Sequence, residues 1–246
     1  MLEHRAVYEL GAFVAASPFL RLLGRGDRHP VLVLPGFTAS DRSTEPLRWF
    51  LRGQGYFVHG WRLGRNVGPT RRIMTGIDAR LFELHERHGR PVSIIGWSLG
   101  GIYARELARR HPSMVRQVIT LGTPFRLAEG DHSAAEPMWQ QLEPYFVEEL
   151  AALRAPEPDK PPLLVPSTAI YTRTDGIVRW HTCIDAEGPR RENIEVYGSH
   201  SGLGVNPAVF IAIADRLSQR EGSWKPFKPP LGSGPMFPRA VIWNAA

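Results

Sequence analysis

Residues 96–100 have the spacing of a serine nucleophile. They read Gly-Trp-Ser-Leu-Gly, follow the apolar run 92–95, and precede a helical pattern that begins near Leu99. A serine on a sharp turn between a strand and a helix exposes its hydroxyl group, and small residues beside it let the backbones approach closely. The pattern predicts that Ser98 attacks an acyl carbonyl, given a base, an orienting acid and oxyanion donors.

Asp175 and His200 are the candidates for the acid and the base. Each follows a run typical of a strand, residues 167–172 for Asp175 and 194–197 for His200. The order nucleophile, acid, base along the chain is the one that completes this kind of nucleophilic turn. Gly176 lets the chain turn after Asp175 and present its carboxylate. We therefore expect both side chains to reach Ser98 from neighbouring strand ends.

Other residues of the same chemical types remain as alternatives. Asp185 is a second candidate for the acid, but it lies away from a strand end. His181 and His132 are alternative bases that lack the position after the last strand. Cys183 is the single cysteine, which excludes an internal disulfide and a multi-cysteine metal site. We expect it to be structural or incidental.

The backbone N–H groups of Phe37 and Leu99 are expected to form the oxyanion hole. Leu99 follows the nucleophile, and Phe37 lies in the loop after the first core strand, which are the two places that supply such donors. Gly36 permits an unusual turn that would point the N–H of Phe37 inward. A simple turn that ends the strand is the alternative.

Aromatic side chains near these positions are candidates for an apolar substrate site. They are Trp97, Phe125, Trp139 and Phe146, with the ring of Phe37 beside them. Substrate pockets are lined mainly by apolar and aromatic side chains, although core packing explains any one of these residues equally well.

The elements that must position these residues form a regular alternation of apolar runs and helical patterns. It predicts one domain of the α/β class, with a mainly parallel sheet of about six strands flanked by helices. Strands are expected at 31–34, 56–61, 92–96, 115–121, 167–171 and 194–197. Helices are expected at 45–54, 70–87, 99–111 and 207–219.

Two segments interrupt or follow this alternation. Residues 126–166 are longer than an ordinary connection, so we expect a small cap with a helix at 136–155. Helical packing filler is the alternative for this segment. Residues 222–246 form a tail rich in proline and glycine, whose aromatic side chains are expected to lie against the domain.

The N-terminal segment, residues 1–29, contains an apolar stretch. Glu9 and Pro18 interrupt it, and it is too short to span a bilayer. We expect a helix that packs on the domain or makes weak contact with a membrane surface, with a signal peptide as the alternative. A cytoplasmic location is expected, with a secreted or membrane-associated protein as the alternative. The sequence leaves the oligomeric state open.

The composition is that of a folded, basic protein. Of 246 residues, 43% are hydrophobic, enough to bury a full core. The net charge of +6 comes almost entirely from arginines that are scattered rather than clustered. Because no recognition motif accompanies the charge, we expect a solvated basic surface and no nucleic-acid partner.

Several segments together resemble the bacterial lipases and esterases of the α/β-hydrolase superfamily. They read Leu-Pro-Gly-Phe at 34–37, Gly-Trp-Ser-Leu-Gly-Gly at 96–101, Leu-Gly-Thr-Pro at 121–124, Thr-Asp-Gly-Ile-Val at 174–178 and Gly-Ser-His at 198–200. The resemblance runs from about residue 30 to 218. It implies the α/β-hydrolase fold in a compact version that lacks the first two strands.

For function, the resemblance implies a small-molecule carboxylic ester or lipid substrate, a role in lipid metabolism, and no cofactor or metal. It also implies a Ser98–His200–Asp175 triad that forms an acyl-enzyme intermediate. Two departures concern the substrate: the loop 34–37 lacks the usual His-Gly, and Trp97 replaces the more usual histidine before the serine.

Three other functions stay open at this point. An acyltransferase would use the same triad with an alcohol or amine in place of water. Amide or peptide hydrolysis would also use it. A non-catalytic binding protein would keep the fold alone, because a fold does not guarantee an activity.

Overall fold

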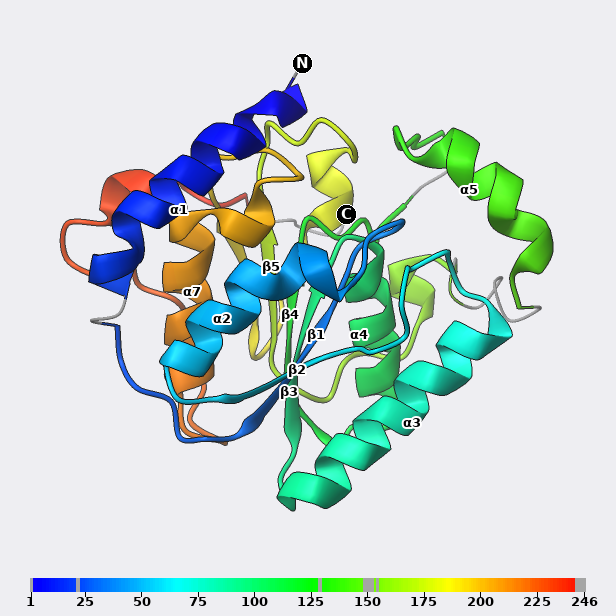
Figure 1. Cartoon of the computed structure of the whole chain (residues 1–246), viewed down its shortest axis with the longest axis horizontal. Coiled ribbons are helices and arrows are strands. Elements are labelled where there is room, and N and C mark those ends of the chain that lie inside the picture. Colours follow the sequence, from blue (N-terminus) through cyan, green and yellow to red (C-terminus); the bar gives the residue numbers. More distant parts are fainter. Residues whose placement is uncertain (1, 21–22, 128–129, 148–152, 154, 242–246) are drawn as a thin grey trace.

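A six-stranded parallel sheet forms the centre of the protein (Figure 1). The computed structural model describes residues 2–20, 23–127, 130–147, 153 and 155–241. The strands lie in the order β2-β1-β3-β4-β5-β6, and every neighbouring pair is parallel. Their bounds are β1 Pro30–Leu34, β2 Phe57–Gly60, β3 Val92–Trp97, β4 Val115–Leu121, β5 Ser167–Tyr171 and β6 Arg191–Glu195. The predicted class and strand number are confirmed.

Helices cover both faces of the sheet and create two apolar cores. Helices α1, α2 and α7 pack on one face, and α3 and α4 pack on the other (Figure 1). The helices are α1 Ala6–Leu20, α2 Glu45–Gly53, α3 Arg71–His88, α4 Leu99–Arg110, α5 Glu136–Leu142 and α7 Pro207–Ser218. Side chains of β1 alternate between the cores, since successive residues of a strand point to opposite faces.

Local sequence signals account for most element boundaries. The Thr70 side chain accepts a hydrogen bond from the N–H of Ile73 and so caps the start of α3. Gly89 ends the same helix in the left-handed conformation, at φ 59°. The last strand lies about three residues earlier than expected, because β6 is a partly exposed edge strand and its first residues are polar.

The predicted cap helix is shorter than the sequence pattern indicated. Helix α5 ends at Leu142, and a single turn of 3-10 helix follows at Glu143–Tyr145. Pro144 lies in that turn and cannot donate a backbone hydrogen bond, which stops the helix. The prediction of one helix over 136–155 is therefore wrong after Leu142, and residues 148–152 and 154 lie outside the described residues.

Both terminal segments pack against the domain. In α1, the ring of Phe13 contacts Phe210 of α7, with a centroid distance of 4.9 Å. At the other end, Phe227 and Phe237 contact each other and pack on the same core as α7. Among the described residues, no helix is long and apolar enough to cross a membrane. The described parts of both termini thus contact the core that α7 helps to form.

Candidate active site

Ser98 occupies a strained turn between β3 and α4. Its φ of 51° and ψ of −123° form a conformation that L residues rarely adopt. The glycines around it are sterically required: a Cβ on Gly96 would lie 2.3 Å from Cα of Gly101, and one on Gly100 would lie 2.5 Å from the carbonyl oxygen of Leu34. The backbones approach so closely that only glycine fits, and the turn presents the Ser98 side chain at the carboxyl edge of the sheet.

His200 and Asp175 form a buried pair at the same edge. Nδ1 of His200 lies 2.6 Å from Oδ2 of Asp175, and both side chains are almost fully buried. The other carboxylate oxygen, Oδ1, accepts hydrogen bonds from the N–H groups of Ile177 and Val178 at 2.9 and 2.8 Å. These two donors fix the carboxylate plane, so Asp175 in turn fixes the orientation of the imidazole ring.

Gly122 brings this pair next to the nucleophilic turn. It follows β4 with a φ of +51°, and a Cβ there would lie 3.1 Å from Nδ1 of His200 and 3.3 Å from Oδ2 of Asp175. The preceding residue, Leu121, accepts a hydrogen bond from the backbone N–H of Ser98 at 2.8 Å. The end of β4 therefore lies between the nucleophile and the acid–base pair and contacts both.

The rival acid lies in a different environment. Oδ2 of Asp185 accepts hydrogen bonds from Arg105 at 2.8 Å and from the Ser167 hydroxyl at 3.1 Å. Burial alone would raise the pKa of Asp185, but the guanidinium of Arg105 lowers it below the ordinary value. Asp185 thus forms a buried ion pair with Arg105, while the carboxylate in contact with His200 is that of Asp175.

The rival bases and the cysteine are also placed elsewhere. His181 lies 3.2 Å from Asp131, and His132 lies 3.4 Å from Glu136 in an exposed position. Cys183 is buried, and burial raises the pKa of its thiol well above the ordinary value, which disfavours the reactive thiolate.

The loop after β1 lies directly against the nucleophile. A Cβ on Gly36 would lie 3.2 Å from Cβ of Ser98, so the backbone just before Phe37 faces the serine. Leu99 is the first residue of α4, and the first N–H groups of a helix have no carbonyl partner within it. The two predicted oxyanion donors therefore flank Ser98 from two different elements.

A buried asparagine that the sequence analysis missed braces this loop. Asn66 is fully buried, and its side-chain amide donates a hydrogen bond to the Pro35 carbonyl at 2.9 Å. The backbone carbonyl of Asn66 accepts a hydrogen bond from the N–H of Thr38 at 2.7 Å, and the backbone N–H of Asn66 donates to the carbonyl of Ala39 at 2.8 Å. These three hydrogen bonds hold the loop in place.

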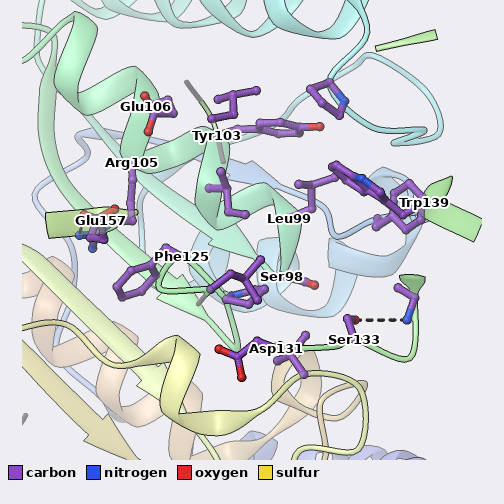
Figure 2. Close-up of a pocket in the computed structure, with 18 of the residues that line it drawn as sticks. Ser98, Leu99, Tyr103, Arg105, Glu106, Phe125, Asp131, Ser133, Trp139 and Glu157 are labelled. Carbon is purple, nitrogen blue, oxygen red and sulfur yellow. Dashed lines mark hydrogen bonds and ion pairs between the residues drawn. The ribbon is translucent and has the colours of Figure 1, made fainter. Parts of the chain in front are cut away.

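A cavity of about 470 Å³ opens beside Ser98 (Figure 2). Apolar groups line most of its wall, with the rings of Phe125 on one side and Trp139 on the other. A charged group lies beyond Phe125, where Arg105 and Glu157 form an ion pair. The cavity thus joins Ser98 to an apolar site with a charged end at Arg105 and Glu157, and Asp131 lines it on another side.

Two of the aromatic residues expected at the substrate site do not belong to the described cavity lining. Trp97 packs against Gly204, and its ring N–H donates to the carbonyl of His200 at 3.2 Å. Phe146 lies behind Trp139, with centroids 4.7 Å apart, and packs onto Gly68. The side chain of Trp97 lies on the other face of β3, away from the cavity, so its contact supports the loop that carries His200. Phe37, Phe125 and Trp139 line the cavity.

Comparison with solved structures identifies the architecture. The chain matches Aspergillus fumigatus lipase B with a TM-score of 0.60 at 18% identity, over 81% of this chain and 55% of that one. It matches a chain of the metagenome-derived lipolytic enzymes LipS and LipT with a TM-score of 0.57 at 20% identity, over 79% of this chain and 93% of that one. The chain has the α/β-hydrolase fold. At these identities the likeness establishes the fold alone.

Sequence comparison adds a relative that is named as an esterase. A pimeloyl-acyl-carrier-protein methyl ester esterase of Aromatoleum aromaticum is 30% identical over 102 aligned residues, which cover 32% of this chain and 41% of that protein. The match thus spans less than half of the relative's length. No model of a known protein family matches the chain.

In this chain the N-terminal segment reaches the loops that carry Asp175 and His200. Glu3 accepts hydrogen bonds from three backbone N–H groups, those of Gly176 at 3.0 Å, His200 at 3.2 Å and Ser201 at 2.7 Å. Burial raises the pKa of Glu3, but a hydrogen bond with the Ser201 side chain and the three backbone hydrogen bonds together lower it by more, so the net pKa lies below the ordinary value. One carboxylate therefore joins the loop of the acid to the loop of the base.

Two more charged residues complete this contact. Glu9 accepts hydrogen bonds from the Ser199 N–H at 2.7 Å and from its hydroxyl at 2.8 Å. Gly202 makes room for Glu9, because a Cβ there would overlap the carboxylate. Arg5 donates to the carbonyls of Thr174 and Gly198 at 3.0 and 2.8 Å. We refer to Glu3, Arg5 and Glu9 as the N-terminal strap.

Only one weak signal in the sequence pointed to the strap. Glu9 interrupts an apolar stretch, and a lone carboxylate in such a helix requires a polar partner. The partner is about 190 residues away, so sequence spacing could not identify it. Asn66 lies in the polar segment between β2 and α3, and nothing in the sequence of that segment indicated its role.

Proposed function

We propose that this protein hydrolyses carboxylic esters through an acyl-enzyme intermediate on Ser98. The observation that carries the proposal is the buried His200–Asp175 pair, 2.6 Å apart, beside a serine held at a positive φ. A serine hydroxyl is a poor nucleophile, and a neutral imidazole oriented by a carboxylate is the usual means of activating it.

The proposed reaction has two balanced steps. His200 accepts the proton of Ser98 while the serine oxygen bonds to the ester carbonyl carbon, and the N–H groups of Phe37 and Leu99 stabilise the oxyanion. The alcohol leaves with the proton returned by His200. Water then attacks the acyl-enzyme, gives its proton to His200, and releases the carboxylic acid as Ser98 recovers its hydrogen.

The cavity suggests the class of acyl group. Apolar walls beside Ser98 favour an aliphatic chain, while the Arg105–Glu157 ion pair at the far end disfavours a longer apolar chain that must displace it. We therefore expect the highest kcat/KM among p-nitrophenyl esters near the hexanoate to decanoate range, with lower values for acetate and palmitate. The relative named as a methyl ester esterase supports an ester bond as the target.

Active-site labelling and substrate profiling test this proposal together. A fluorophosphonate probe should label the folded protein at Ser98, as read by mass spectrometry, and leave Ser98→Ala unlabelled. Absence of labelling in the folded protein would contradict the proposed nucleophile. A preference for acetate would contradict the proposed acyl site but not the reaction. Product analysis with a competing alcohol distinguishes hydrolysis from acyl transfer.

The N-terminal strap gives a prediction about catalytic positioning. In Glu9→Ala the buried N–H of Ser199 loses its acceptor, at a cost of about 1–3 kcal/mol, and the loop that carries His200 shifts. We expect kcat to fall about tenfold with little change in KM, because small displacements of a catalytic group slow the chemical step.

A conservative variant separates positioning from general stability. Glu9→Gln keeps an oxygen for the Ser199 N–H and can donate to its hydroxyl, so we expect it to retain most of the wild-type kcat. Glu86→Ala, which removes an exposed glutamate from α3, should leave kcat unchanged. Equal kcat values for Glu9→Ala and the wild type would show that the strap has no role in positioning.

A further inference from the structure

Helix α1 carries apolar side chains on both its inner and its outer side. Phe13 and Leu20 on the inner side join the core, and Glu9 on the same side contacts the loop of His200. On the outer side, large apolar side chains are exposed to solvent. Tyr8 is 79% exposed and Phe19 is 72% exposed. Amphipathic helices on the surface of soluble domains normally carry polar and charged residues on the outer side.

The exposed face of α1 contains no charged residue. The helix is described throughout, and its exposed positions are Val7, Tyr8, Leu10, Gly11, Ala12, Val14, Ala15, Pro18 and Phe19. At 100° per residue these positions fall on one continuous arc of the helix. We call these nine residues the outer face of α1. Figure 1 shows that α1 lies at the periphery of the molecule, on the far side of α7 from the sheet.

Neighbouring residues extend this face in a way that suits a membrane interface. Trp49 of α2 is 47% exposed and contacts Phe13 of α1 edge to face. Tryptophan and tyrosine prefer the boundary between headgroups and acyl chains. Arg25 and Arg28 are exposed in the segment that follows α1, and the chain has a net charge of +6. Asp27, between these two arginines, is paired with Arg90 and Arg116. An apolar face with cations beyond its C-terminal end is complementary to an anionic lipid surface.

We propose that the outer face of α1 docks on a lipid surface that contains anionic headgroups. A single exposed apolar residue needs no explanation, but a continuous apolar helix face with arginines beyond its C-terminal end does. The same helix holds the catalytic loops through Glu9 on its inner side. Docking would thus place the active-site loops close to a membrane. The docking itself does not depend on the proposed ester hydrolysis.

Vesicle co-sedimentation of the full chain tests the proposal without any measurement of turnover. We expect binding to vesicles of phosphatidylglycerol and phosphatidylcholine, and weaker binding to phosphatidylcholine alone or at high salt. The double variant Val14→Ser/Phe19→Ser should need about tenfold more lipid for half-maximal binding, because it removes two exposed apolar side chains. Both residues are exposed, so the variant should fold normally.

The matched control is Leu164→Ser, which removes a 64% exposed leucine from the loop before β5. It should bind vesicles like the wild type. The proposal is overturned if the wild type stays in the supernatant with anionic vesicles, or if the double variant sediments as well as the wild type. A wild-type dimer that the double variant converts to a monomer, with no vesicle binding, would assign the outer face to a second copy of the chain.

Discussion

Replacement of Ser98 by alanine is expected to lower kcat/KM for the best p-nitrophenyl ester by about 10⁴-fold or more, because it removes the nucleophile. The remaining rate would come from the oxyanion donors and binding alone. The far-ultraviolet circular dichroism spectrum should not change, since the alanine keeps the backbone and Cβ of the turn. A variant that kept near wild-type turnover would exclude Ser98 as the nucleophile.

A second substitution at the same position tests the strain that the structure places there. Ser98 has a φ of 51°, and such a conformation costs an L residue about 1–3 kcal/mol. Glycine adopts positive φ without this cost but gains entropy in the unfolded chain. We expect Ser98→Gly to be as inactive as Ser98→Ala yet to melt about 2–4 °C higher. Equal melting temperatures for the two variants would argue against the strain.

The sheet, and the placement of the candidate acid and base after its strands, could be predicted because both depend on local signals. Continuous apolar runs identify strands buried on both faces, and β4 and β5 match their predicted bounds. The position of Asp175 after β5 and of His200 after β6 follows from chain order. In a parallel sheet these ends share one edge, so the structure brings the two side chains within 2.6 Å.

The direction of a side chain could not be predicted from the same signals. Trp97 lies next to the nucleophile in sequence, but its ring points to the other face of β3 and supports the loop of His200. Phe146 packs against Trp139, which lines the cavity, but is not itself among the lining residues. Proximity in sequence therefore predicted that these rings lie near Ser98 and the cavity, but it did not predict the direction in which each ring points.

Contacts between segments that are far apart in the sequence also could not be predicted. Asn66 braces the oxyanion loop from a connection 31 residues away from Pro35. Glu3 contacts a loop 197 residues away, at His200. A single sequence carries no information on such pairs beyond the need of a buried polar group for a partner. The sequence therefore indicated the residues proposed for the chemistry, whereas it did not indicate Asn66 or Glu3, which contact their loops.

Replacement of Asp175 by asparagine should lower kcat/KM by about 10⁴-fold, because it stabilises the wrong tautomer of His200. Oδ1 of Asp175 accepts two backbone N–H groups, so the asparagine oxygen would take that position and its NH₂ group would face Nδ1 of His200. Nδ1 must then accept a hydrogen bond, which places the proton on Nε2. The imidazole can no longer take the proton of Ser98, although all heavy atoms keep their positions.

The matched control is Asp185→Asn, which alters the rival carboxylate. Asp185 pairs with buried Arg105, so this variant should lower the melting temperature because the guanidinium loses part of its compensating charge. The folded fraction should keep kcat/KM within about threefold of the wild type, since Asp185 lies outside the His200 hydrogen-bond network. The reverse result, with Asp185→Asn inactive and Asp175→Asn active, would transfer the role of the acid to Asp185. The two variants together thus separate a carboxylate that orients the base from one that stabilises the fold.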